Sequence, residues 1–265
     1  MFSSPAQRTF KSNWFWRTAT AIPLLILLGL GIYDYYDRRV FEPVLWSLVA
    51  FFAVPFIFAL VWAATRRIAI HEEGISSSSI IGRKDLRWDE ITETRYGQRP
   101  VKSDNYLSGI LWFVLSAITK GDTLIRSLRI MGPRTIRITS NISQAQEAIR
   151  MVLDTVNPRL RQDAERMLSA GGTAVFGHIA LSPTGVVWKS KEPIPYAAIV
   201  KCRLDDAMLR IKGKGKWLDN IAIRPQSVPN VFVLLDMIEA RRDSESGQQA
   251  AAAAAGSSAR QYLEG

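Results

Sequence analysis

The fold is decided by the stretch Arg67-Ile68-Ala69-Ile70-His71-Glu72-Glu73-Gly74-Ile75. Apolar residues alternate up to Ile70, a polar cluster follows, and Gly74 precedes a second apolar alternation. Alternation of period two is typical of a half-buried β-strand, and a polar cluster with glycine is typical of a turn. This stretch therefore predicts a strand, a tight turn and a second strand.

The same series of segments occurs twice in the chain. Each series holds a strand pair with a glycine turn, a strand with an aromatic residue, a short apolar strand and an amphipathic helix. In the first copy these segments are Arg67–Ile75, Leu86–Ile91, Ile136–Ile138 and Gln144–Thr155. In the second copy they are His178–Val186, Ile194–Ile199, Ile221–Ile223 and Val231–Arg242.

This repetition predicts an α+β fold with two antiparallel β-barrel or sandwich repeats, each closed by an amphipathic helix. Repeat 1 covers residues 67–157 and contains an apolar insertion, residues 97–123, that repeat 2 lacks. A linker helix over residues 158–172 leads to repeat 2, residues 173–243. Residues 244–265 are rich in alanine, glycine and glutamine and are predicted to form a disordered tail.

Two uncharged apolar runs precede the repeats, at Thr18–Tyr33 and Pro43–Thr65. The second run has 23 residues, and at about 1.5 Å per residue a helix of that length crosses a hydrocarbon core of about 30 Å. Aromatic residues flank the first run and extend it. Residues 1–66 therefore predict a transmembrane helical hairpin with spans at about 15–35 and 43–65. A signal peptide is the competing interpretation of the first run, although residues 31–34 offer no cleavage site.

The basic residues around these runs predict the orientation of the hairpin. Five basic residues flank the hairpin and two lie in its connection: Arg8, Lys11, Arg17, Arg66 and Arg67 against Arg38 and Arg39. This distribution favours a multi-pass inner-membrane protein with both termini in the cytoplasm. The lone Cys202 suits a reducing compartment, because one cysteine forms no internal disulfide.

No residue earns a catalytic or metal-binding assignment. The two histidines, His71 and His178, and one cysteine are dispersed and do not fill a zinc site. Gly213-Lys214-Gly215-Lys216 lacks the spacing of a phosphate loop and instead predicts a basic hairpin tip. We therefore expect a protein that is not an enzyme and that uses no cofactor or metal.

A net charge of +10 favours contact with an anionic lipid surface or an acidic protein, although a basic surface also serves solubility alone. Nucleic acid is not an expected partner, because the basic residues are spread among carboxylates without a known module signature. The candidate contacts for a partner or lipid are five basic residues: Lys212, Lys214, Lys216, Arg83 and Lys84.

The insertion of repeat 1 contains an almost wholly apolar segment, Leu107–Ile118. At about 1.5 Å per residue this segment is too short to span a membrane as a helix. It is either buried against the repeats or dips into the membrane surface through Leu111, Trp112 and Phe113.

Two sets of motifs carry a resemblance to a known family. They are Glu73-Gly74-Ile75 with Leu86–Ile91, and Phe176-Gly177-His178-Ile179 with Gly185-Val186 and Val228-Pro229-Asn230. They resemble bacterial membrane-anchored pleckstrin-homology-like proteins with tandem domains, a family of unknown function. The resemblance implies two such domains over residues 66–242. Eukaryotic relatives of that fold often bind phosphoinositides through a basic first hairpin loop, a pattern that Ser76–Ser79 does not reproduce.

The sequence thus favours a non-enzymatic, membrane-anchored binding or scaffold protein. Its cytoplasmic tandem domains are expected to contact a protein partner or the anionic membrane surface. The alternative is an accessory subunit of a transport or envelope complex, in which the transmembrane hairpin makes the specific contact.

Overall fold

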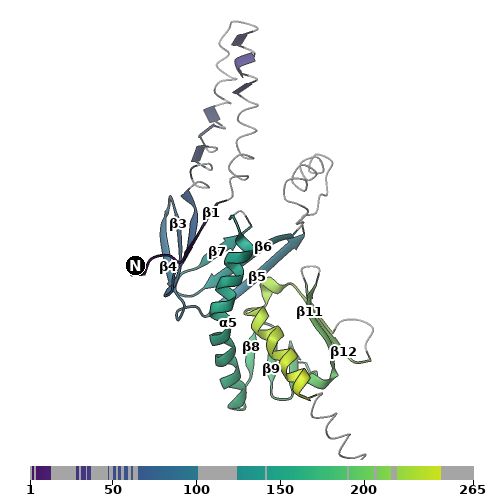
Figure 1. Cartoon of the computed structure of the whole chain (residues 1–265). Helices are drawn as coiled ribbons and strands as arrows, with labels where there is room; N and C mark the ends of the chain where they lie inside the picture. The colour runs from purple at the N-terminus through teal and green to yellow at the C-terminus, as the bar shows by residue number, and fades with distance from the viewer. Residues whose placement is uncertain are drawn as a thin grey trace, which may run out of the picture. The chain divides into compact units, whose positions relative to one another are not determined.

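The computed structural model describes residues 2, 4–12, 65–100, 124–140, 142–189, 191–205, 208–215 and 220–245, with scattered residues between 28 and 61 (Figure 1). The strands are β1 (Arg8–Lys11), β2 (Arg67–Ile70), β3 (Gly74–Ser79), β4 (Gly82–Arg87), β5 (Glu93–Pro100), β6 (Leu124–Met131), β7 (Ile136–Thr139), β8 (Ala174–Phe176), β9 (Ile179–Ser182), β10 (Gly185–Trp188), β11 (Ile199–Asp205), β12 (Met208–Gly213) and β13 (Ile221–Ile223). The helices are α5 (Ala145–Ser169), residues 231–245, and the short 3-10 turns η1 (Tyr196–Ala198) and η2 (Pro225–Ser227).

The described strands form four small, mostly antiparallel sheets, ordered β1-β2-β3-β4, β5-β6-β7, β10-β9-β8 and β11-β12-β13. The chain divides into two compact units. Unit 1 comprises Met1–Glu90 and Pro133–Arg150, and unit 2 comprises Ile91–Gly132 and Met151–Gly265.

The predicted architecture is wrong. The strands make four small sheets in place of two barrels that each close with a helix. The transmembrane hairpin of residues 1–66 is not supported either, because no helix in the described part of the chain is long and apolar enough to cross a membrane. The longest described helix, α5, carries charged residues along its length. Most residues of the two predicted spans lie outside the described residues.

Three further expectations depended on the hairpin and are corrected with it. They are a multi-pass inner-membrane location with both termini in the cytoplasm, the transmembrane character of the protein, and an integral contact with the membrane through two spans. The two spans rested on the hydropathy of the apolar runs, which measures how apolar a run is and not which structure it adopts. The orientation rested on the basic residues around those runs and has no basis without the hairpin.

Unit 1 is built around the predicted strand–turn–strand. β2 and β3 pair in antiparallel register from Arg67↔Ser78 to Ile70↔Ile75, which confirms the pattern of period two. The alternating side chains on one face are fully buried and are joined by apolar residues of β4, β7 and α5: Ile68, Ile70, Ile75, Leu86, Ile136, Ile138, Ala148 and Ile149. Gly74 lies tightly against β4, since a Cβ atom there would clash with the Leu86 carbonyl and lie 2.8 Å from Arg87 Cα.

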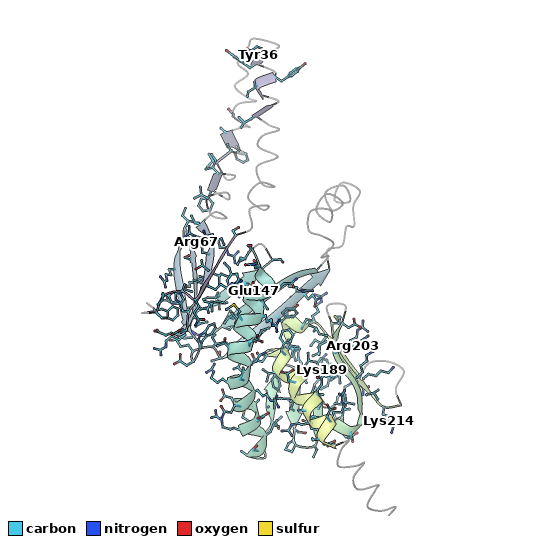
Figure 2. The ribbon with its side chains drawn as sticks, viewed as in Figure 1. Tyr36, Arg67, Glu147, Lys189, Arg203 and Lys214 are labelled. Carbon is cyan, nitrogen blue, oxygen red and sulfur yellow. The ribbon has the colours of Figure 1, made fainter. Side chains whose placement is uncertain are left out.

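Residues near the N-terminus also belong to unit 1. β1 pairs with β2 from Arg8↔Ile70 to Lys11↔Arg67, and Phe10 is 2% exposed. The Ser143 N–H donates to the Lys11 carbonyl at 2.8 Å, and Arg8 forms an ion pair with Glu147, which lies near the start of α5 and is labelled in Figure 2. β1 is therefore held both by its neighbouring strand and by the start of α5.

One helix, α5, replaces the two that were predicted, Gln144–Thr155 and the linker helix over residues 158–172. The helix runs unbroken through Pro158, because the apolar stripe continues beyond it. Leu160, Ala164 and Leu168 are buried on the helix after the proline. Burial of these three side chains offsets the loss of the hydrogen bond that a proline in the helix interior cannot donate.

In unit 2 the second strand–turn–strand forms as predicted. β9 and β10 pair from Ser182↔Gly185 to Ile179↔Trp188. Tyr196 is fully buried beside them, and its hydroxyl donates to the Ser182 carbonyl at 2.8 Å. The predicted helix Val231–Arg242 is also confirmed, within helical residues 231–245, and Val231, Leu234 and Ile238 are buried on it.

In unit 2, hydrogen bonds between Thr94 and Asn230 join β5 to the start of this helix. Asn230 Oδ1 accepts hydrogen bonds from Thr94 N at 2.7 Å and Thr94 Oγ1 at 3.1 Å. The Asn230 N–H in turn donates to the Thr94 carbonyl at 2.8 Å. Asn230 has φ 49°, a left-handed conformation that asparagine tolerates better than most residues.

Candidate anion-binding face

One face of the β11-β12 strand pair carries only basic side chains along two successive cross-strand pairs. Lys201 lies opposite Lys212, and Arg203 lies opposite Arg210. The intervening pairs belong to the other face, because successive side chains of a strand point to opposite sides of a sheet. Cys202, Ile211 and Leu209 on that other face are buried.

The four basic side chains line a shallow cavity of about 200 Å³. Lys201 and Arg203 are exposed, whereas Arg210 and Lys212 are half-buried. Figure 2 shows Arg203 and Lys214 along this part of unit 2. We call the four residues Lys201, Arg203, Arg210 and Lys212 the basic face.

The basic face places like charges close together, which lowers the stability of the sheet. Like charges placed directly opposite each other on a strand pair are destabilising. Arg203 forms an ion pair with Asp205 at the end of β11. Two opposed like-charge pairs side by side break a local rule of sheet design, and such violations are expected at functional sites.

The side chain directly beneath the basic face is chemically inert. Burial, reinforced by the negative charge of Glu239 and opposed by Arg242, raises the pKa of the Cys202 thiol to about 12. The thiolate is the reactive form of cysteine, so Cys202 supplies no nucleophile at neutral pH. Cys202 therefore adds no nucleophile to the basic face.

Of the predicted contact residues that the structure describes, Lys212 alone belongs to this face. Lys214 follows β12, and its N–H donates to the Ala198 carbonyl at 2.6 Å. Lys216 lies outside the described residues. Arg83 and Lys84 belong to β4 of unit 1, where Arg83 Nε donates to Asp85 Oδ1 at 2.7 Å.

Sequence reasoning missed the three other members of the basic face. Lys201, Arg203 and Arg210 are separated in sequence by a turn, and the strand register places them together. A signal was present, because β11 contains Lys-x-Arg and β12 contains the mirrored Arg-x-Lys. Recognising it required knowing which residues face each other across the hairpin.

The second predicted contact, the segment with Leu111, Trp112 and Phe113, lies outside the described residues. Whether this segment is buried or dips into a membrane stays a prediction.

The two histidines, His71 and His178, contact groups of the fold around them. His71 is buried in unit 1, with Nε2 at 3.1 Å from Ser76 Oγ and Nδ1 at 3.2 Å from the Ser4 carbonyl. His178 lies edge-on to Trp188 in unit 2, with ring centroids 6.3 Å apart. Among the residues that the structure describes, no group of three or more His, Cys, Asp or Glu side chains is placed to hold a metal ion.

These features define a mostly antiparallel β protein with a basic sheet face. The chain belongs to a family described as "Family of unknown function (DUF6585)", whose model matches residues 5–247. This membership agrees with the expectation of a family without an assigned function. No curated protein and no solved structure matches the chain. The resemblance to pleckstrin-homology-like proteins finds no support in these comparisons.

Proposed function

We propose that this protein is a non-enzymatic binding protein that holds an acidic segment of a protein partner on the basic face. The observation that carries the proposal is the placement of four cationic side chains as two opposed pairs around one cavity. Their mutual repulsion costs stability, and a bound anion relieves it.

The chemistry of the face favours binding over catalysis. General acid–base work needs a group that exchanges its proton near neutral pH. The four side chains of the basic face include no histidine and no carboxylate, and burial raises the pKa of the Cys202 thiol to about 12.

A protein segment suits the face better than a small metabolite does. Ligand pockets for small molecules have volumes of about 300–1,000 Å³ and enclose most of the ligand. The cavity between the basic side chains is smaller, and two of its four lining residues are exposed. An extended acidic chain contacts all four cations without having to be enclosed.

The test is a fluorescence anisotropy titration of a labelled glutamate–serine peptide with the full-length protein, at low and at high salt. Arg210→Gln with Lys212→Gln removes two positive charges from the basic face, and Lys189→Gln with Lys191→Gln removes two exposed charges elsewhere in unit 2. Exposed ion pairs contribute about 0.2–1 kcal/mol each. The first variant should therefore bind about tenfold more weakly, while the control variant binds like the unaltered protein.

Two outcomes would overturn the proposal. Equal weakening in both variants would show that net charge alone attracts the peptide. Binding to phosphatidylserine vesicles in the absence of any peptide binding would replace the protein partner with a lipid surface.

A further inference from the structure

We infer that the basic face recognises the spacing of its ligand, namely two carboxylates two residues apart in an extended segment, acidic-x-acidic. This inference rests on the proposed function and names the class of partner that the same face accepts.

The strand register sets the spacing of the four cationic side chains, which form a two-by-two grid. Residues directly opposite on antiparallel strands have Cα atoms about 4.5–5.5 Å apart. Residues two apart along one strand are separated by about 6.6–6.8 Å. The pair Lys201–Lys212 and the pair Arg203–Arg210 therefore form two rows of cations separated by one strand repeat.

An extended ligand segment parallel to the strands has the same repeat. Its alternate side chains point to the same side, also about 6.6–6.8 Å apart. One carboxylate then lies between Arg203 and Arg210, whose planar guanidinium groups match carboxylate geometry. The next carboxylate on that side lies between Lys201 and Lys212. Acidic residues that are adjacent in sequence point to opposite sides and leave one row without an anion.

The two ends of the grid differ in charge. Beyond the arginine row lie Asp205 and its cross-strand partner Met208, so a third acidic residue there would meet a carboxylate. Beyond the lysine row the register shifts between Ile199 and Lys201, and Val200 is 59% exposed. Lys214, two residues after Lys212 and just past β12, is exposed and adds a cation beyond the lysine row. The motif therefore ends at the arginine row, beyond which Asp205 lies, and two carboxylates two residues apart fill the two rows.

The experiment compares two labelled peptides of identical composition and with blocked ends, Ser-Glu-Ser-Glu-Ser and Ser-Glu-Glu-Ser-Ser, by anisotropy with the full-length protein. Peptides this short do not form stable helices in water, so the spacing in the extended state is what differs. We expect the alternating peptide to bind about fivefold more tightly. Lys201→Gln with Lys212→Gln should abolish this preference by leaving one row, and the Lys189→Gln, Lys191→Gln control should retain it.

The outcomes separate the two proposals. Equal affinity of both peptides for the unaltered protein overturns the spacing inference and leaves the proposed function standing. Absence of binding by either peptide overturns both. A thermal melt shows that the lysine variant is folded, and its melting temperature should not fall, because the substitution removes an opposed like-charge pair.

Discussion

Replacing Asn230 with alanine tests whether the hydrogen bonds that join β5 to the helix at residues 231–245 stabilise unit 2. The side-chain oxygen accepts from the Thr94 N–H at 2.7 Å and from the Thr94 hydroxyl at 3.1 Å. Thr94 is 2% exposed, so water does not replace the lost acceptor. The substitution Asn230→Ala leaves both Thr94 donors without the oxygen that now satisfies them.

The magnitude follows from two terms. The fixed Thr94 N–H left without a partner costs about 1–3 kcal/mol, and the Thr94 hydroxyl is not counted because its hydrogen can rotate toward another acceptor. Alanine in the left-handed conformation that Asn230 adopts, φ 49°, costs about 1 kcal/mol more. The free energy of unfolding should fall by roughly 2–4 kcal/mol, which lowers the melting temperature by roughly 10 °C.

The assay is urea and thermal unfolding followed by circular dichroism, with hydrogen exchange of the Thr94 amide as a local readout. Asn230→Asp is the matched control, because aspartate keeps an acceptor oxygen and also tolerates the left-handed conformation. The alanine variant should show faster exchange at Thr94 and the aspartate variant should not. The reasoning is refuted if alanine costs less than about 0.5 kcal/mol, the range of neutral surface substitutions.

Two more predictions concern Gly74 and Cys202. Gly74→Ala should destabilise unit 1 by about 2–3 kcal/mol, because its Cβ would clash with the Leu86 carbonyl of β4; an unchanged melting temperature would contradict this. Burial raises the Cys202 pKa from 9.0 to about 12, so the folded state holds this proton more tightly than the unfolded state does. The resulting stability is complete below pH 9 and is lost as the pH rises toward 12, a dependence that denaturant melts should show and that Cys202→Ala should reduce.

The local elements were predictable wherever a strong pattern spanned several residues. The pairs β2-β3 and β9-β10 follow from alternation and a glycine turn, and the helix over residues 231–245 follows from its apolar stripe. β1 has four residues of which only Phe10 is buried, so it shows no readable period. Pro158 indicated a helix end, but burial of the residues that follow it decided otherwise.

The arrangement of the strands was harder to predict than their existence. Hydropathy predicted a membrane hairpin that the described helices do not support. The repeat predicted two barrels, but which strands pair is set by contacts between residues far apart in sequence. The basic face illustrates the same limit, because its members became neighbours only once Lys201 was placed opposite Lys212.

The division of unit 1 into two sequence segments has a consequence for how the chain is made. β1 finds its partner β2 only after more than fifty further residues have been synthesised. The core of unit 1 also requires Ile136 and Ile138 of β7 and the first turns of α5, up to Arg150. Long-range contacts of this kind form late, and chains that await them expose apolar surface. On the ribosome, unit 1 therefore stays incomplete until part of unit 2 has already emerged.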